Sequence, residues 1–288
     1  MAPALSCYTT ALVKHLGGTA ADRLAEAVHL WVRTDDPNKA LAFSHHDRID
    51  DGALAYRHCD GWEETRDALA DQLARDGSVI VAGNALHLPW SPHHGVRAVP
   101  HWFLLRARRE QHWRVVDPFH ALMPGGEQRP HDGWLDDDSL RKAMTPLERL
   151  DPPVLNRDVH ALGTATDVGA LDHYRWLRTG EPSPPAWSGT WLRDPVEVLT
   201  CLRDRFVADE DVLEQHTDDL WAAARHHIHR QAAHPAPALA DAWARLPKAL
   251  RFAADSARRG RRRTGVVSQA FDSLIELTTR TEVRHARP

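Results

Sequence analysis

Apolar residues near the start of the chain repeat at helical spacing. Leu12, Val13 and Leu16 fall on one side of a helix that is expected to begin at Cys7. Gly17-Gly18 follows and is a typical C-terminal stop, because glycine adopts the backbone conformation that ends a helix. The pattern therefore predicts one short helix with a cysteine at its N-terminus.

Two further helices are predicted in the first hundred residues. Apolar residues at helical spacing predict one over residues 19–32. An Asp-x-x-Glu capping box predicts another over residues 60–75. Between them lie a turn at residues 34–38 and short extended pieces at residues 41–43 and 53–56.

Extended segments follow the third helix. Residues 78–82 form a continuous run rich in β-branched side chains, which predicts a buried strand. Residues 100–106 and 113–116 are extended segments on either side of a polar turn, and together they predict an antiparallel hairpin. Pro118 is expected to end it, because proline cannot continue a central ladder.

The pattern weakens after the hairpin. Residues 123–138 are expected to form a loop, followed by a helix over residues 139–150 and a strand over residues 154–159. Residues 181–190 are rich in proline and predict a stiff joint between domains. Residues 1–180 are therefore expected to form an α+β domain in which the N-terminal helix packs on an antiparallel sheet.

Beyond the joint, every apolar pattern is helical. Helices are expected over residues 195–206, 211–229, 237–256 and 265–281. Pro247 lies inside the third of these and is expected to kink or split it. Residues 191–288 are therefore expected to form a separate helical domain.

Composition narrows the class of function. The 288-residue chain carries a formal net charge of −4, which argues against the basic surface of a general nucleic-acid binder. Its three cysteines have no regular spacing, so neither a disulfide framework nor a zinc site is expected. The sequence has no charged-then-apolar leader and no apolar run that could span a bilayer. A cytoplasmic location, without nucleic-acid or membrane partners, is expected.

Cys7 is the first candidate for chemistry. Ser6 is a suitable N-cap, which puts the thiol in the first helical turn, where free N–H groups and the helix dipole stabilise a thiolate. The alternative is a small buried hydrophobic residue. His101 opens one strand of the hairpin and Asp117 closes the other, so pairing brings an imidazole beside a carboxylate. If the Cys7 helix packs on the His101 face, the three form a nucleophile, a base and an orienting acid.

These segments resemble a known family. The Cys7 helix and the stretches His101-Trp102-Phe103-Leu104-Leu105 and Trp113-Arg114-Val115-Val116-Asp117-Pro118 are similar to papain-like cysteine enzymes of the bacteriocin-leader peptidase kind. Within that group, the sequence more closely resembles the N-terminal domain of the butirosin-biosynthesis acyltransferase family. The resemblance covers roughly residues 5–120 and includes the buried strand and the glycine-containing loop that precede His101.

The resemblance implies a papain-like fold and covalent acyl transfer. An acyl group carried as a phosphopantetheine thioester on an acyl or peptidyl carrier protein moves to the cysteine. It then passes to the amine of an aminoglycoside or amino-sugar as an amide, in antibiotic biosynthesis. A lincosamide-type condensing enzyme fits equally well. The enzyme itself is expected to bind no cofactor and no metal, since the phosphopantetheine belongs to the carrier protein.

Two alternatives to acyl transfer stay open. One is a hydrolase of the same fold, a cysteine peptidase or a thioesterase, which needs an open site and no acceptor. The other is a catalytically silent binding module, against which the intact cysteine, histidine and aspartate argue.

The oxyanion site is the point at which this sequence departs from the peptidase pattern. Papain-like peptidases commonly place a glutamine about six residues before the cysteine, and Met1 holds that position here. The Cys7 backbone N–H is one candidate donor, and Asn84, at the end of the buried strand, is a second. The alternative for Asn84 is an ordinary turn residue. A thioester is already activated, so the missing glutamine weakens the case for a peptidase more than the case for an acyltransferase.

Arginine is concentrated in one short segment of the C-terminal region. The residues are Arg251, Arg258, Arg259, Arg261, Arg262 and Arg263, with only Asp255 of opposite charge among them. One interpretation is a solvated helix end. The other is a dock for an acidic carrier protein and its phosphate, since guanidinium groups suit phosphate.

The histidines and tryptophans outside the hairpin receive simpler interpretations. His226, His227 and His229, like the pairs at residues 45–46 and 93–94, lack the spacing of a zinc helix and are expected on the surface. Trp90, Trp102, Trp113 and Trp134 gather around the proposed site in sequence. Core packing explains them first, and lining a pantetheine tunnel or stacking on a sugar is the alternative.

Overall fold

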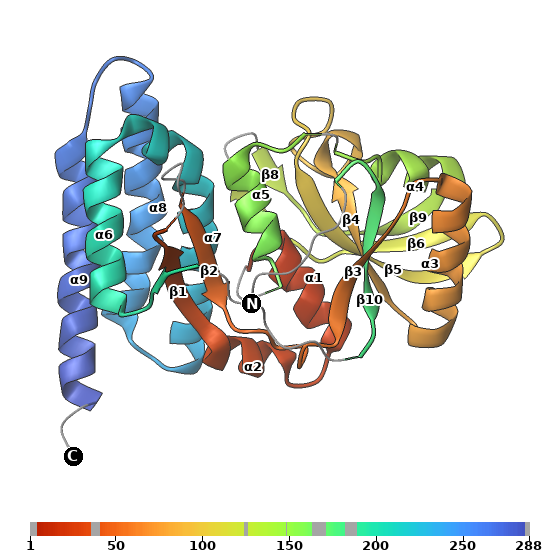
Figure 1. Ribbon diagram of the computed structural model, residues 1–288, viewed down its shortest axis with the longest axis horizontal. Coiled ribbons are helices and arrows are strands. Elements are labelled where there is room, and N and C mark those ends of the chain that lie inside the picture. Colours follow the sequence, from red (N-terminus) through yellow and green to blue (C-terminus); the bar gives the residue numbers. More distant parts are fainter. Residues whose placement is uncertain are drawn as a thin grey trace. The chain divides into compact units, whose positions relative to one another are not determined.

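The chain folds into two compact units. The computed structural model describes residues 5–35, 41–123, 126–147, 149–162, 171–181 and 189–285. One unit, here called the sheet unit, contains the described residues of 4–21 and 48–186. The other, the helical unit, contains those of 22–47 and of 187 onward. Figure 1 shows their elements, coloured along the chain.

The sheet unit is organised around an antiparallel sheet with the strand order β3-β10-β4-β5-β6-β9. These strands are β3 (Leu54–Cys59), β4 (Val79–Asn84), β5 (Pro100–Arg109), β6 (His112–Asp117), β9 (His131–Asp136) and β10 (Tyr174–Thr179). The predicted hairpin of β5 and β6 is confirmed, with Leu104 opposite Val116. β4 is buried along its length, as its β-branched run predicts.

Helices cover both faces of this sheet. They are α1 (Cys7–Leu16), α3 (Trp62–Asp76), α4 (Asp137–Ala143) and α5 (Pro152–Val159). α3 packs on the face that carries Phe103 and Leu105, in a shared cluster of buried side chains. Successive residues of a strand point to opposite faces, so Trp102 belongs to the other face. The ring of Tyr8 in α1 contacts Trp102 there, with the ring centroids 5.5 Å apart.

A small ribbon and a 3-10 turn complete the sheet unit near the start of β5. The ribbon pairs β7 (Ala121–Met123) with β8 (Gly126–Gln128). The 3-10 turn, η1 (Ala85–His87), directly follows β4. Both lie in segments that connect sheet strands, where functional side chains are commonly carried on a rigid scaffold.

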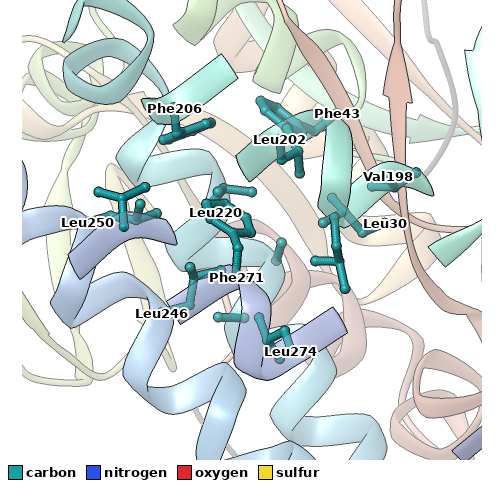
Figure 2. Close-up of a cluster of buried hydrophobic side chains, with 14 of the residues drawn as sticks. Leu30, Phe43, Val198, Leu202, Phe206, Leu220, Leu246, Leu250, Phe271 and Leu274 are labelled. Atoms are coloured by element: carbon teal, nitrogen blue, oxygen red, sulfur yellow. The ribbon is translucent and has the colours of Figure 1, made fainter. Parts of the chain in front are cut away.

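The helical unit combines a three-stranded sheet with long helices. The sheet has the order β11-β1-β2, from β11 (Trp191–Leu192), β1 (Val28–Arg33) and β2 (Ala42–His46). The helices are α6 (Pro195–Ala208), α7 (Glu210–Ala233), α8 (Pro237–Ala257) and α9 (Thr264–His285). Figure 2 shows their shared core, in which Leu30 of β1 and Phe43 of β2 join Leu202, Leu220 and Phe271 of the helices. Truncating such a buried leucine to alanine typically costs about 2–5 kcal/mol.

The predicted helix over residues 19–32 is wrong in its second half. α2 (Ala20–Ala27) stops after eight residues, and β1 follows at once. Val28, Leu30 and Val32 are buried while their neighbours are half-buried, the alternation of a strand. Val32 pairs with Phe43 on one side and with Leu192 on the other. Pairing with strands distant in sequence therefore overrides the helical spacing of the apolar residues.

Two further predicted elements are wrong in type. The strand expected over residues 154–159 is helix α5, which begins at Pro152, a residue favoured in a first helical turn. The loop expected over residues 123–138 contains β8 and β9. β9 alternates only between half-buried and exposed residues, so its apolar pattern is weak, and pairing with β6 holds it in place. The helix expected over residues 139–150 is the shorter α4.

The domain boundaries also differ from the expectation. The described residues of 22–47 pack with the C-terminal helices, so the expected domain of residues 1–180 is not one continuous unit. Of the expected joint at residues 181–190, residues 182–188 lie outside the described residues. α8 runs through Pro247 without being split. Within the described ranges, none of the helices combines the length and the apolar composition that spanning a bilayer requires.

Candidate active site

Cys7 is the first residue of α1, as its sequence context predicts. The hydroxyl oxygen of Ser6 caps the helix by accepting a hydrogen bond from the Thr9 backbone N–H at 3.2 Å. Gly17, with a φ of 65°, ends the helix. Cys7 is half-buried. The thiol therefore stands where the free N–H groups and the dipole of α1 favour a negative charge.

His101 and Asp117 meet across the β5–β6 hairpin. The register puts Leu104 opposite Val116, so the two residues lie diagonally rather than directly opposite each other. Their side chains nevertheless meet, with His101 Nε2 2.6 Å from Asp117 Oδ2. Both residues are buried, and Asp117 has no exposed surface. The predicted contact between the His101 imidazole and the Asp117 carboxylate is present.

The Cys7 thiol completes this arrangement. The thiol is hydrogen-bonded to the His101 side chain and also to the backbone of Trp102. Because Nε2 of His101 is hydrogen-bonded to Asp117, Nδ1 is the ring nitrogen that remains for the hydrogen bond with the Cys7 thiol. The face expectation needs a correction: the body of α1 packs on the Trp102 face, not on the His101 face. Cys7, its first residue, reaches His101, which lies at the beginning of β5.

Burial and charge act in opposite directions on the two titrating groups. Burial raises the pKa of Cys7, but the His101 charge, its hydrogen bond and the Trp102 backbone lower it, and the net effect is a lowered pKa. Burial lowers the pKa of His101, but Asp117 and Cys7 raise it to about 10. A thiolate beside an imidazolium is therefore the favoured state near neutral pH, which is the reactive form of a cysteine nucleophile.

Asp117 is held by donors from several directions. Its Oδ2 atom accepts from Trp90 Nε1 at 2.8 Å and from Gln128 Nε2 at 2.8 Å, in addition to His101. Its Oδ1 atom accepts from the Phe119 backbone N–H at 3.0 Å. A buried carboxylate is costly unless hydrogen bonds compensate for the lost water, and these contacts supply that compensation.

Trp90 is itself fixed by a stacked ring. His131 lies parallel to it, with the ring centroids 4.0 Å apart and an interplanar angle of 4°. Gly133 makes room for His131, since a Cβ atom at this position would come within 2.9 Å of the imidazole. The indole N–H is thereby directed at Asp117.

Asn84 behaves as a turn residue. It is the last residue of β4, and its side-chain oxygen accepts from the Leu86 backbone N–H at 3.1 Å, which caps η1. That contact matches the alternative interpretation of Asn84. Its role as an oxyanion donor stays a prediction.

The arginine cluster is partly neutralised by α7. Acids four residues apart on α7 pair with three of its members: Glu210 with Arg262 at 2.6 Å, Glu214 with Arg258 at 2.9 Å, and Asp218 with Arg251 at 3.8 Å. These pairs connect α7 with α8 and with the segment that follows α8. The side chains of Arg259, Arg261 and Arg263 are exposed and form no ion pair within the part of the chain that the structure describes. A dock for an acidic partner would therefore rest on those three.

The expectation of surface histidines is wrong for the C-terminal group. His226 and His229 are buried, and His227 is half-buried and stacks on Trp243 with the ring centroids 4.0 Å apart. The ring of His226 lies 5.4 Å from that of His46 in β2. The pairing of β1 with β2, which the sequence did not predict, is the reason, because these two strands supply the surface that covers this part of α7.

The tryptophans separate into core and site. Trp113 is fully buried and donates from its indole to Asp137, and Trp102 packs under α1. Trp134 is 41% exposed, with the Arg109 guanidinium over its ring. Trp90 contacts the Cys7–His101–Asp117 site with its side chain, by donating from the indole to Asp117.

Gln128 was not among the residues that the sequence suggested. It lies in a stretch that reads as loop, and no local pattern distinguishes it from other polar residues there. Its relation to Asp117 depends on the fold of the β7–β8 ribbon.

No protein family model matches this chain, and a search of curated proteins returned no match either.

Proposed function

We propose that the protein is a cysteine-dependent acyltransferase with a papain-like catalytic unit. It would move an acyl or aminoacyl group from a carrier-protein phosphopantetheine thioester, through Cys7, to the amine of an aminoglycoside or amino-sugar. The observation that carries the proposal is the contact of Cys7 with the buried His101–Asp117 pair, in which each residue has the partner that its role requires. The helix that presents the cysteine and the strand that presents the histidine support the papain-like assignment.

The resting ion pair accounts for the first half of the reaction. The Cys7 thiolate attacks the carbonyl carbon of the donor thioester, and a new carbon–sulfur bond forms to Cys7. The bond to the pantetheine sulfur breaks, and the His101 imidazolium gives its Nδ1 proton to that leaving group. The products are an acylated Cys7, a neutral His101 and a free pantetheine thiol.

The second half returns the enzyme to its starting state. The acceptor amine attacks the Cys7 thioester, and neutral His101 takes a proton from the amine as the carbon–nitrogen bond forms. Cys7 leaves as a thiolate beside the regenerated imidazolium. Asp117 holds the ring by its Nε2 atom throughout and does not exchange protons with substrate.

The exposed arginines support a carrier protein as the donor partner. Arg259, Arg261 and Arg263 carry three positive charges that form no ion pair with the acids of the described residues. An acidic carrier protein with a phosphate on its prosthetic group matches that charge and chemistry. The paired members, Arg251, Arg258 and Arg262, contribute less, because acids of α7 already offset them.

Intact-mass analysis after mixing with acyl-loaded carrier proteins tests the proposal. The wild-type chain is expected to gain the mass of the acyl group, and an added amine acceptor should remove it as an amide. Cys7→Ala should gain nothing, whereas Cys201→Ala is the matched control and should load normally. Loading followed by release to water at the same rate with or without amine would favour the thioesterase alternative. No loading from any acyl thioester would contradict both.

A further inference from the structure

We infer that Gln128 is a positioning residue that fixes the Asp117 carboxylate and so sets the direction of the His101–Asp117 hydrogen bond. The effect of Gln128 on acyl transfer rests on the proposed function. Its effect on the stability of the Cys7 thiolate does not depend on which reaction the protein catalyses. The side-chain nitrogen of Gln128 lies 2.8 Å from Asp117 Oδ2 and 3.2 Å from His101 Nε2. Both nitrogens direct a hydrogen at the same carboxylate oxygen, so Gln128 acts on His101 through Asp117.

The burial of Gln128 argues for a specific task. The residue has no exposed surface, and its side-chain nitrogen donates to Asp117 Oδ2 at 2.8 Å. Its side-chain oxygen is buried and has no hydrogen-bond partner in the described part of the structure. Leaving an amide oxygen unpaired costs free energy. Turning the amide over would bring two oxygen atoms together at Asp117, so the contact with the carboxylate decides the orientation.

The arrangement also determines which nitrogen of His101 exchanges a proton beside Cys7. Trp90, Gln128 and the Phe119 backbone all donate to Asp117, so its carboxylate acts only as an acceptor. The contact of 2.6 Å from His101 Nε2 then needs a hydrogen on that nitrogen. Nδ1 is left to gain and lose the proton beside Cys7.

The chain between Asp117 and Gln128 is built to return to the site. Phe119 follows Asp117 closely and places its ring against His101, with the centroids 5.8 Å apart. The β7–β8 ribbon then reverses the chain, and Ala121 pairs with Gln128. An outer contact between His120 and Glu127, at 3.0 Å, joins the two strands of the ribbon. The ribbon therefore delivers one buried amide to the carboxylate.

The test measures the reactivity of Cys7 without any acyl donor. Alkylation of Cys7 by iodoacetamide is followed across pH by peptide mass spectrometry, with Cys201 as the internal reference. Gln128→Met keeps the shape of the side chain but removes the donor, and Gln128→Asn keeps the amide but is too short to reach Asp117. Gln72→Met is the matched control, because Gln72 is an equally buried glutamine that bonds Leu177 and Trp176 at 2.9 Å each, away from Asp117.

Loss of positioning should raise the pH at which Cys7 reacts. In Gln128→Met we expect the half-maximal pH of alkylation to rise by about one unit, a tenfold loss of thiolate at a given pH below it. Gln72→Met should keep the wild-type profile. Where Gln128→Met does not fold, as judged by circular dichroism, Gln128→Asn decides. A profile in the folded variant that is unchanged, or moved to lower pH, overturns the inference.

Turnover keeps this inference separate from the proposed function. If acyl transfer occurs, Gln128→Met should lower kcat by about 10- to 100-fold with KM nearly unchanged, as expected for one lost charge-assisted hydrogen bond. A shifted alkylation profile in a protein that transfers no acyl group would support the positioning role and contradict the acyltransferase. Acyl transfer at the wild-type rate in Gln128→Met, with an unshifted alkylation profile, would support the acyltransferase and contradict the positioning role.

Discussion

Histidine is buried in both units of this protein, with opposite electrostatic results. In the sheet unit, Asp117 and Cys7 raise the pKa of His101 to about 10 despite its burial. In the helical unit, burial and neighbouring histidines lower the pKa of His29 to about 2, and burial lowers that of His227 to about 3. His101 is buried, and His29 and His227 are half-buried. The difference is a buried carboxylate in hydrogen-bond contact, which His101 has.

The nearest acid to His29 shows why contact matters. Asp47 Oδ2 lies 3.8 Å from His29 Nδ1, but the Asp47 side chain is 59% exposed. His29 Nε2 faces the Ser44 hydroxyl at 2.9 Å instead, a partner that carries no charge. Water screens an exposed acid, whereas Asp117 acts through a dry contact. A buried histidine is therefore a charged catalyst or a neutral packing group according to its partner.

The largest expected effect is the loss of the nucleophile. Cys7→Ala should lower turnover by at least about 10⁴-fold, because the acyl group then has no covalent carrier. Its fold should be retained, since a small side chain replaces a small one at the helix start. Circular dichroism and steady-state kinetics check this, with Cys201→Ala as the control. Full turnover in folded Cys7→Ala would leave only a direct transfer, in which the site merely aligns donor and acceptor.

Removing the carboxylate should make His101 resemble the histidines of the helical unit. Asp117→Asn is expected to lower kcat by roughly 10²- to 10⁴-fold while leaving measurable activity, because an orienting acid does not exchange protons itself. Asp117 is the largest of the influences that raise the pKa of His101. The alkaline limb of the pH–rate profile should therefore move down from about 10 toward neutral pH.

A second histidine–aspartate pair provides the control for that variant. His216 and Asp219 are also buried and lie 3.2 Å apart, but in the helical unit. Asp219→Asn breaks a comparable contact and should change stability without moving the alkaline limb. Equal effects of Asp117→Asn and Asp219→Asn on the pH–rate profile would mean that His101 has no special role.

The helical unit should lose stability as the pH falls below about 6.5. His29 has a folded-state pKa of about 2, so the unfolded chain binds a proton at pH values where the folded chain does not. Each such histidine costs up to about 1.4 kcal/mol per pH unit below 6.5, until the folded pKa is reached. His29→Gln removes one titrating group and should make the free energy of unfolding less dependent on pH.

Hydrogen exchange resolves this effect within one unit. Peptides from α7, followed by mass spectrometry at increasing urea, report the stability of the helical unit at pH 7.5, 5.5 and 4.5. The difference in the free energy of unfolding between wild type and His29→Gln should narrow or change sign as the pH falls. A constant difference across that range would show that His29 is not kept neutral by the fold.

The parts of the site that the sequence predicts are those with local causes. The Ser6 cap, the Gly17 stop and the turn between β5 and β6 each lie within a few residues of the element they define. The thiol, imidazole and carboxylate follow from those elements. The parts that sequence reasoning missed depend on remote partners.

Remote pairing explains each of the failures. β1 is a strand because residues near 43 and 192 pair with it, and this pairing also buries His226 against β2. Gln128 reaches Asp117 because the ribbon folds back, not because of its neighbours in sequence. α7 carries acids at helical spacing that pair with the arginines, a pattern visible only once α8 is known to lie beside it. Tertiary context decides such elements.

The smallest effect is expected from charges that remain in water. Reversing Arg259, Arg261 and Arg263 to glutamate should raise the KM for a carrier-bound donor by roughly 3- to 10-fold, since exposed charges contribute mainly to steering and weak binding. The rate with a pantetheine-sized donor should not change, because uniform binding to the carrier has been removed and transition-state stabilisation has not. Higher salt should raise the wild-type KM for the carrier-bound donor, because salt screens the same exposed charges.

Arg258→Glu and Arg262→Glu are the matched controls. Their partners are acids of α7, so each variant should lower stability by at most about 1 kcal/mol and should change the KM for the carrier-bound donor less than the triple variant does. Equal effects on both donors would mean that the triple variant disturbs the fold, and an unchanged KM for the carrier would leave these arginines as a solvated helix end.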